Sequence, residues 1–166
     1  GEVEAADAAL WGAQTQRAVE NFRVGGPLPN AFIRAVALIK VVAAEANLSL
    51  GELPKDKASA IVAAALKVVA GEYADQFPVD IYQTGSGTST NMNVNEVVAH
   101  LAAQAGVNVH PNDDVNHSQS SNDTIPTAIH LSARLAVAPL QQALERLDEC
   151  LAQRADELMK VVKPGR

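Results

Sequence analysis

Cysteine, aromatic residues and long apolar runs are all scarce in this sequence of 166 residues. The only cysteine, Cys150, excludes an internal disulfide framework and is typical of a reducing compartment. No run reaches the roughly 18 apolar residues of a membrane span, and the acidic N-terminus lacks the basic and then apolar pattern of a secretory signal. We therefore expect a soluble, cytoplasmic protein.

Positive charge is also in short supply, because 19 acidic side chains stand against 13 basic ones and the formal net charge is −6. A chain of this charge is a poor partner for nucleic acids and for anionic membranes, and we expect neither. A site for an anionic ligand would have to be built locally, from neutral donors and the ends of helices.

Apolar residues make up 48% of the chain, yet aromatics contribute only 4%, so alanine and valine supply most of the apolar surface. This composition favours closely packed helices over a β-sandwich. We predict an all-α fold with a short helix near residues 13–21 and further helices over 30–51, 55–77, 96–106 and 123–162.

The last predicted helix carries one stripe of mostly apolar side chains, spaced by four or three residues. The stripe consists of Leu140, Leu144, Leu147, Leu151, Ala155, Leu158 and Val162. This spacing is typical of a helix in a bundle, and we expect Pro139 to kink the helix without ending it. At ~1.5 Å per residue, about forty residues reach roughly 60 Å, so the outer half needs partners beyond one small domain.

Two dense polar runs stand directly before predicted helices. They span residues 83–96 and residues 110–127, the second reading HPNDDVNHSQSSNDTIPT. First-turn N–H groups lack intrahelical partners and carry the positive end of the helix dipole, so hydroxyls and amides placed there suit a carboxylate or a phosphate. An ordinary helix cap beside a polar loop explains the same residues and is the commoner arrangement.

Two familiar ligand motifs are only partly present. Residues 85–87 read Gly-Ser-Gly, but the third glycine and the surrounding strands of a dinucleotide-binding unit are missing. A calcium loop starting at Asp114 would have Gln119 in place of the turn glycine and Ile125 in place of the bidentate glutamate. We reject both.

Metal and nucleophilic sites are also poorly supported by spacing. His110 and His117 stand beside Asp113 and Asp114, but this arrangement matches no standard set of metal ligands, so we predict no metal. The serines are many, and none can be paired with a histidine by spacing alone.

Three groups of residues nevertheless resemble one known family in order and spacing. They read LWGAQTQRA at 10–18, QTGSGT at 83–88 with NMNVNE at 91–96, and HPNDDVN with SQSSND between 110 and 123. The chain is similar throughout to class II fumarase, of the aspartase/fumarase superfamily. The aspartase branch typically has different residues in all three groups, so an ammonia lyase is the weaker alternative.

The resemblance implies the fold, the activity and the assembly. Residues 1–117 would form the N-terminal helical domain and residues 118–166 the start of the central helix bundle, so the chain would correspond to the N-terminal part of a longer protein. Family members hydrate fumarate reversibly to L-malate as homotetramers, without metal or organic cofactor.

The resemblance also assigns site residues. Substrate carboxylate would be held by Ser86, Gly87 and Thr88 and by Ser120, Ser121 and Asn122. A second dicarboxylate site would consist of His110, Pro111, Asn112 and Asp113. We expect no catalytic residue in this segment, because the family's Thr-His pair and its serine loop come later. A catalytically silent dicarboxylate-binding or assembly fragment therefore stays open beside a working part of a hydratase.

Overall fold

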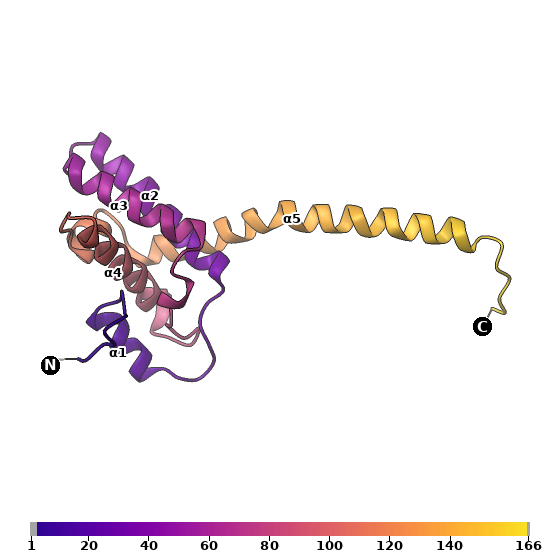
Figure 1. Cartoon of the computed structure of the whole chain (residues 1–166), viewed down its shortest axis with the longest axis horizontal. Helices are drawn as coiled ribbons and strands as arrows, with labels where there is room; N and C mark the ends of the chain where they lie inside the picture. The colour runs from indigo at the N-terminus through magenta and orange to yellow at the C-terminus, as the bar shows by residue number, and fades with distance from the viewer. Residues whose placement is uncertain (1–2, 166) are drawn as a thin grey trace. The chain divides into compact units, whose positions relative to one another are not determined.

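The computed structural model describes residues 3–165, and within this range it is helical, with a single isolated β-bridge between Pro27 and Asp80. The predicted all-α fold is confirmed. The longer helices are α1 (Ala13–Asn21), α2 (Asn30–Ser49), α3 (Lys55–Ala70), α4 (Thr88–Gln104) and α5 (Ser121–Leu158), and the short turns are η1 (Ala74–Gln76), η2 (Gly85–Gly87) and η3 (Pro111–Val115) (Figure 1).

The chain divides into two units, one ending at Ser132 and one starting at Ala133, so the first turns of α5 belong to the first unit. The domain boundary expected after residue 117 concerns a longer protein and stays a prediction. No helix among the described residues is long and apolar enough to cross a membrane.

The first unit is built on α2, α3 and α4, of which α2 and α3 lie side by side (Figure 1). Val36 of α2, Ile61 of α3 and Val97 of α4 are completely buried in one shared core. Alanines occupy many of the remaining buried positions, and such short side chains let helix backbones approach closely. This packed core holds the N-terminal end of α4 in a defined place.

Helix α3 ends earlier than predicted. It stops at Ala70, because Gly71 takes a left-handed conformation with φ of 92° that a helix cannot continue through. The N–H of Glu72 then donates to the carbonyl of Lys67, which closes the helix end. The predicted extension to residue 77 is wrong, and the chain there contains only the short turn η1.

Helix α4 begins earlier than predicted, at Thr88 rather than near residue 96. Most of the first polar run therefore lies inside the helix, and Thr90, Asn91, Asn93 and Asn95 are buried. Hydrogen bonds offset part of the cost of burial: the side chain of Gln83, for example, accepts from the backbone N–H of Thr90 at 2.9 Å and donates to its hydroxyl at 2.8 Å. The Oδ1 atoms of Asn93 and Asn95 are buried without a hydrogen-bond partner.

Glu96 joins α1 to α4 by capping the start of α1. Its carboxylate accepts from the backbone N–H groups of Gly12, Gln14 and Thr15 at 2.9, 3.0 and 3.1 Å, and from the Thr15 hydroxyl at 2.6 Å. A Cβ atom at Gly12 would lie 2.8 Å from Glu96 Oε1, so a larger residue would displace the carboxylate that caps α1. The residues around Trp11, which form the first of the three groups that resemble class II fumarase, thus have a structural role.

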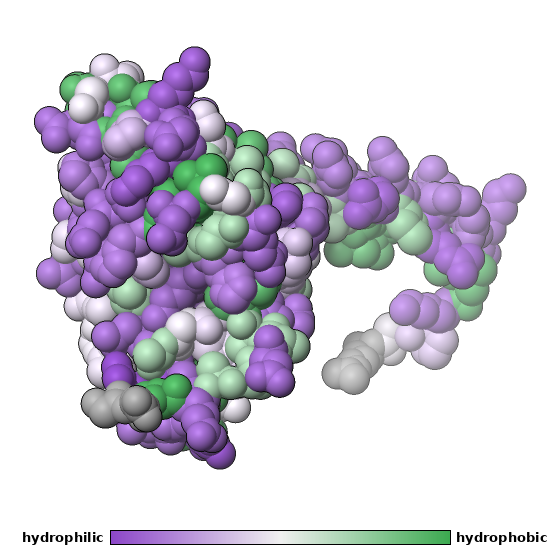
Figure 2. All heavy atoms as spheres, turned by 60° about the vertical axis from the view of Figure 1, so that its left-hand side comes forward, coloured by the Kyte–Doolittle hydropathy of each residue, from purple (hydrophilic) through white to green (hydrophobic). Residues whose placement is uncertain are grey.

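The second unit is the outer part of α5, and every described residue from 133 to 165 is exposed. Figure 2 shows hydrophobic side chains in green along one side of this helix and hydrophilic ones in purple along the other. Leu140, Leu144, Leu147 and Leu151 are 54–60% exposed. The helix continues through Pro139 and ends at Leu158, so Val162 lies outside it, contrary to the predicted stripe.

Candidate functional site

The starts of α4 and α5 lie against each other in the first unit. A Cβ atom added at Gly87 would meet Ile125 Cγ1 at 3.0 Å, so α5 packs directly on the turn before α4. The side chain of Asn91 reaches across from α4 and donates to the hydroxyl of Ser121 at 3.3 Å. The structure therefore brings together the two groups of residues predicted to hold a carboxylate, although they are far apart in sequence.

Ser86, Gly87 and Thr88, the first group predicted to hold a carboxylate, form a tight turn that exposes two hydroxyl side chains. Ser86 and Gly87 both have left-handed backbone conformations, with φ of 64° and 66°, and Gly87 caps α4. Ser86 and Thr88 are exposed. A positive φ at a residue other than glycine is strained and often marks a functional site. The turn directs first-turn N–H groups of α4 and these hydroxyls to the same end of the helix.

The second group combines a cap with accessible polar side chains. The Ser120 hydroxyl accepts from the backbone N–H of Asn122 at 3.2 Å, and the Ser120 carbonyl accepts from that of Thr124 at 2.9 Å, so Ser120 caps α5. Ser121 is half-buried beside Asn91, while Asn122 is exposed. Capping thus accounts for Ser120, and Asn122 is available to a ligand.

A hollow of about 270 Å³ adjoins the first group between α1 and α4. Thr88 and Ser89 line it from α4, and Gln14 and Arg17 line it from α1. A cavity of this size admits a small organic acid, and its lining offers hydroxyl, amide and guanidinium donors.

A buried lysine lies behind these helix starts, and the sequence patterns did not indicate it. Lys40 of α2 is 0% exposed, and its ammonium donates to Asn91 Oδ1, Asn116 Oδ1 and Gln119 Oε1 at 2.7, 3.0 and 2.8 Å. Burial lowers the pKa of Lys40 to about 7. The only signal in the sequence was a lysine inside a mostly apolar helical run that also contains Arg34 and Glu45, so Lys40 reads equally well as an exposed position.

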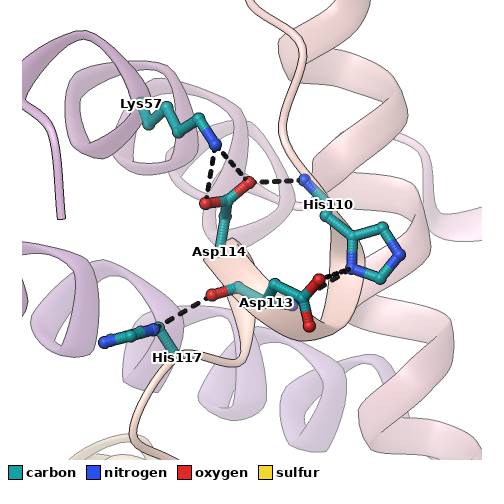
Figure 3. A network of polar contacts seen from close by, with 5 residues as sticks. All are labelled: Lys57, His110, Asp113, Asp114 and His117. Atoms are coloured by element: carbon teal, nitrogen blue, oxygen red, sulfur yellow. Dashed lines mark hydrogen bonds and ion pairs between the residues drawn. The ribbon is translucent and has the colours of Figure 1, made fainter.

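The residues of the second dicarboxylate site lie together on the turn η3 (Figure 3). The His110 imidazole caps this turn, because its Nδ1 accepts from the backbone N–H of Asp113 at 3.1 Å. Asp113 Oδ2 lies 3.1 Å from the same nitrogen. His110, Asn112 and Asp113 are exposed, and Pro111 starts the turn.

Asp114 anchors this turn to α3 (Figure 3). Its carboxylate accepts from Lys57 at 2.8 and 2.9 Å and from the backbone N–H of His110 at 2.7 Å. Burial raises the pKa of Asp114, but the hydrogen bond from His110 and the Lys57 ammonium outweigh it and leave that pKa below its usual value. No hydrogen bond among the described residues joins the side chains of His110, Asn112 and Asp113 to either helix start. Within residues 3–165, no group of three or more His, Cys, Asp and Glu side chains is arranged to hold a metal ion.

Comparison with known proteins shows which family the chain is similar to. A family profile described as Lyase matches residues 1–166. The class II fumarate hydratase of Mycobacterium tuberculosis is 55% identical, over 100% of this chain and 35% of that protein. The class II fumarate hydratase of Xylella fastidiosa is 58% identical, over 95% of this chain and 34% of that protein. The crystal structure of class II fumarase from Schistosoma mansoni superposes with a TM-score of 0.91 at 40% identity, covering 100% of this chain and 37% of that one.

The profile match covers the whole chain, so the chain belongs to this family of lyases. Within the family it is similar to class II fumarate hydratases, so the resemblance seen in the three groups of residues is confirmed. The chain spans about 35% of the length of the curated relatives it matches.

Proposed function

We propose that this chain is the N-terminal part of a cytoplasmic fumarate hydratase, in which it supplies residues that bind the substrate's carboxylates. The complete protein would add water reversibly to fumarate and form L-malate. The observation that carries the proposal is the meeting of the α4 and α5 starts, through Gly87 against Ile125 and Asn91 against Ser121, in a chain 55% identical to a fumarate hydratase.

The chemistry of these helix starts suits a dicarboxylate. In the proposal, Ser86, Gly87 and Thr88 hold one carboxylate with hydroxyl and backbone N–H donors at the positive end of α4. Ser120, Ser121 and Asn122 act in the same way at the start of α5. Hydration begins with proton removal beside one carboxylate, and fixed donors stabilise the extra negative charge that then develops. The groups that move protons are proposed to lie outside this segment, and no metal or organic cofactor is part of the proposal.

The turn η3 is proposed as a second place where a dicarboxylate binds. The side chains of His110, Asn112 and Asp113 are exposed there, whereas the Pro111 carbonyl already accepts from the backbone N–H of Asn116 at 3.1 Å. Because Asp113 repels an anion unless it is neutralised, this site should bind more weakly than the paired helix starts.

A homotetrameric assembly is also part of the proposal. The stripe of leucines on α5 is exposed in the single chain, and apolar stripes with this spacing pair with other helices in bundles. The alternative function is a catalytically silent dicarboxylate-binding or assembly fragment.

The proposal is tested with the complete protein that contains this chain. We expect it to interconvert fumarate and L-malate, followed by the absorbance of fumarate, and to release no ammonia from aspartate at a comparable rate. Ammonia release at such a rate would move the protein to the aspartase branch. If neither reaction occurs while fumarate still binds, the silent binding fragment is the better description.

A further inference from the structure

Lys40 is a buried cation whose contacts are all neutral. Its ammonium has three donors, and Asn91, Asn116 and Gln119 each take one through a side-chain carbonyl oxygen. Among the residues that the structure describes, no carboxylate lies within 4.0 Å of Lys40 Nζ. A buried ammonium normally has a counter-ion, because taking a charge out of water is costly. The ammonium of Lys40 therefore has its three hydrogen-bond acceptors, but no negatively charged group in the described part of the chain neutralises its charge.

The side chains around Lys40 continue to the start of α5. We call Lys40, Asn91, Asn95, Asn116 and Gln119 the amide cluster. Asn91 Nδ2 and Asn95 Nδ2 both donate to Asn116 Oδ1, at 3.0 and 3.3 Å. Asn91 Nδ2 also donates to the hydroxyl of Ser121.

The amide cluster also shapes the backbone that leads into α5. Asn116 Nδ2 donates to the carbonyl of Gln119 at 3.1 Å, and Gln119 Nε2 donates to the carbonyls of Val115 and His117 at 2.9 and 3.2 Å. Gln119 directly precedes Ser120, the cap of α5. One buried ammonium therefore orients the side chains that determine where the turn of Ser120, Ser121 and Asn122 lies.

The other charged side chains on the segments that pack around Lys40 either have partners of their own or are exposed. Asp114 pairs with Lys57, Asp113 lies beside His110, and His117 lies 4.0 Å from Glu52. On α4, the Glu96 carboxylate caps α1, and His100 is exposed. On α2 and α3, Arg34 donates to a backbone carbonyl, and Glu45, Lys55, Asp56 and Lys67 are exposed. The positive charge of Lys40 is therefore not offset by the side chains packed around it.

We propose that Lys40 is a positioning residue for dicarboxylate binding, which holds the start of α5 in place through the amide cluster and supplies a buried positive charge that the bound dicarboxylate offsets. This inference rests on the proposed function. It assigns Lys40 no contact with substrate, because Asn91 stands between Lys40 and Ser121 in the chain of hydrogen bonds.

Two variants of the complete protein separate this role from simple packing. Lys40→Met removes the ammonium and keeps an unbranched apolar stem. Asn116→Asp keeps an oxygen acceptor for Lys40 and places a carboxylate beside it, so the charge is cancelled while the lysine stays, and the hydrogen bond from Asn116 Nδ2 to the Gln119 carbonyl is lost as well. Lys67→Met is the matched control, because it removes an exposed ammonium from α3. For each protein we would measure kcat and KM for fumarate, and the inhibition constant of succinate, a dicarboxylate that cannot react.

We expect Lys40→Met and Asn116→Asp each to weaken succinate inhibition and to raise the KM of fumarate by about tenfold or more, with Lys67→Met unchanged. In the wild type, succinate should bind less tightly as the pH rises from about 7 to about 9, because Lys40, whose pKa is about 7, loses its proton. This dependence should be absent in Lys40→Met. Calorimetry of the wild type in two buffers should show proton uptake when succinate binds in the same pH range.

The outcomes distinguish a failure of the proposed function from a failure of the proposed role of Lys40. If the wild type does not turn over fumarate, the proposed function fails and this inference fails with it. If the wild type is active but Asn116→Asp keeps wild-type succinate affinity, the inference alone is overturned and Lys40 serves packing only. Should both variants fail to fold, the wild-type calorimetry decides: binding without proton uptake overturns the inference.

Discussion

At the scale of single residues, Thr88 and Asn122 are the most direct test of the candidate site, because both are exposed at a helix start. If they donate to the substrate as its charge develops, replacing either by alanine should remove about 2–4 kcal/mol of transition-state stabilisation. We expect kcat/KM of the complete protein to fall accordingly, with little change in its unfolding midpoint.

Matched controls for this prediction are Ser59→Ala and Asn30→Ala, which remove an exposed hydroxyl and an exposed amide from α3 and α2. A loss of tenfold or less in both site variants, accompanied by lower stability, would show that Thr88 and Asn122 only stabilise their helices.

Lys40 also makes stability depend on pH in a defined direction. Its pKa of about 7 in the folded chain lies below the ~10.4 of an unfolded lysine, so the unfolded chain holds more protons between these values. The contribution of Lys40 to the free energy of unfolding is therefore fully present above about pH 10. It is lost as the pH falls towards about 7, by up to ~1.4 kcal/mol per pH unit.

Chemical denaturation at several pH values checks this prediction, with the protein concentration held constant. We expect the free energy of unfolding of the wild type to rise with pH relative to Lys40→Met over that window. Lys67→Met should follow the wild type. Parallel curves for the wild type and Lys40→Met would mean that the ammonium is not desolvated.

At the scale of elements, the contact between α4 and α5 depends on Gly87. Alanine there would have both a left-handed backbone, with φ of 66°, and a Cβ atom 3.0 Å from Ile125 Cγ1. We expect Gly87→Ala to lower the free energy of unfolding by about 1–3 kcal/mol and to reduce kcat/KM, because α5 must shift away from α4.

Gly51→Ala separates the two causes. Gly51 also has a positive φ, 76°, but nothing lies within 4 Å of its Cβ position. This control should lose stability from the backbone alone and keep kcat/KM. Equal losses of activity in the two variants would argue against a site formed where the two helices meet.

At the scale of the whole molecule, we predict that the 166-residue chain alone does not hydrate fumarate and does not stay monomeric. Leucines that are 54–60% exposed along one side of α5 forgo a few kcal/mol of burial at ~25 cal/mol per Å² of apolar surface. The stripe should therefore pair with another copy, which light scattering would detect, while a fumarate assay would show no turnover.

A double variant, Leu144→Gln with Leu151→Gln, should restore the monomer. Arg146→Gln with Glu149→Gln, on the other side of the helix, should leave self-association unchanged. A wild-type monomer whose outer α5 is fully protected from hydrogen exchange would contradict the assembly prediction, and turnover near that of a complete enzyme would contradict the other.

The residue pattern along the chain was enough to predict the helical fold, the existence of α2, α3 and α5, and the family. Long apolar patterns and a leucine stripe depend on spacing along one helix, which is visible in the chain. The three groups of residues, from Leu10 to Asp123, were sufficient to identify the resemblance to class II fumarase, and the comparisons confirm it.

The residue pattern did not predict where α4 begins, where α3 ends or what surrounds Lys40, because these features depend on how distant segments pack. The buried amide nitrogens of Asn91 and Asn95 find their acceptor, Asn116 Oδ1, on a different segment, and such partners have no signature in local sequence. The meeting of Gly87 with Ile125 has the same origin. Contacts between residues distant in sequence depend on how helices pack, so no local pattern reveals them.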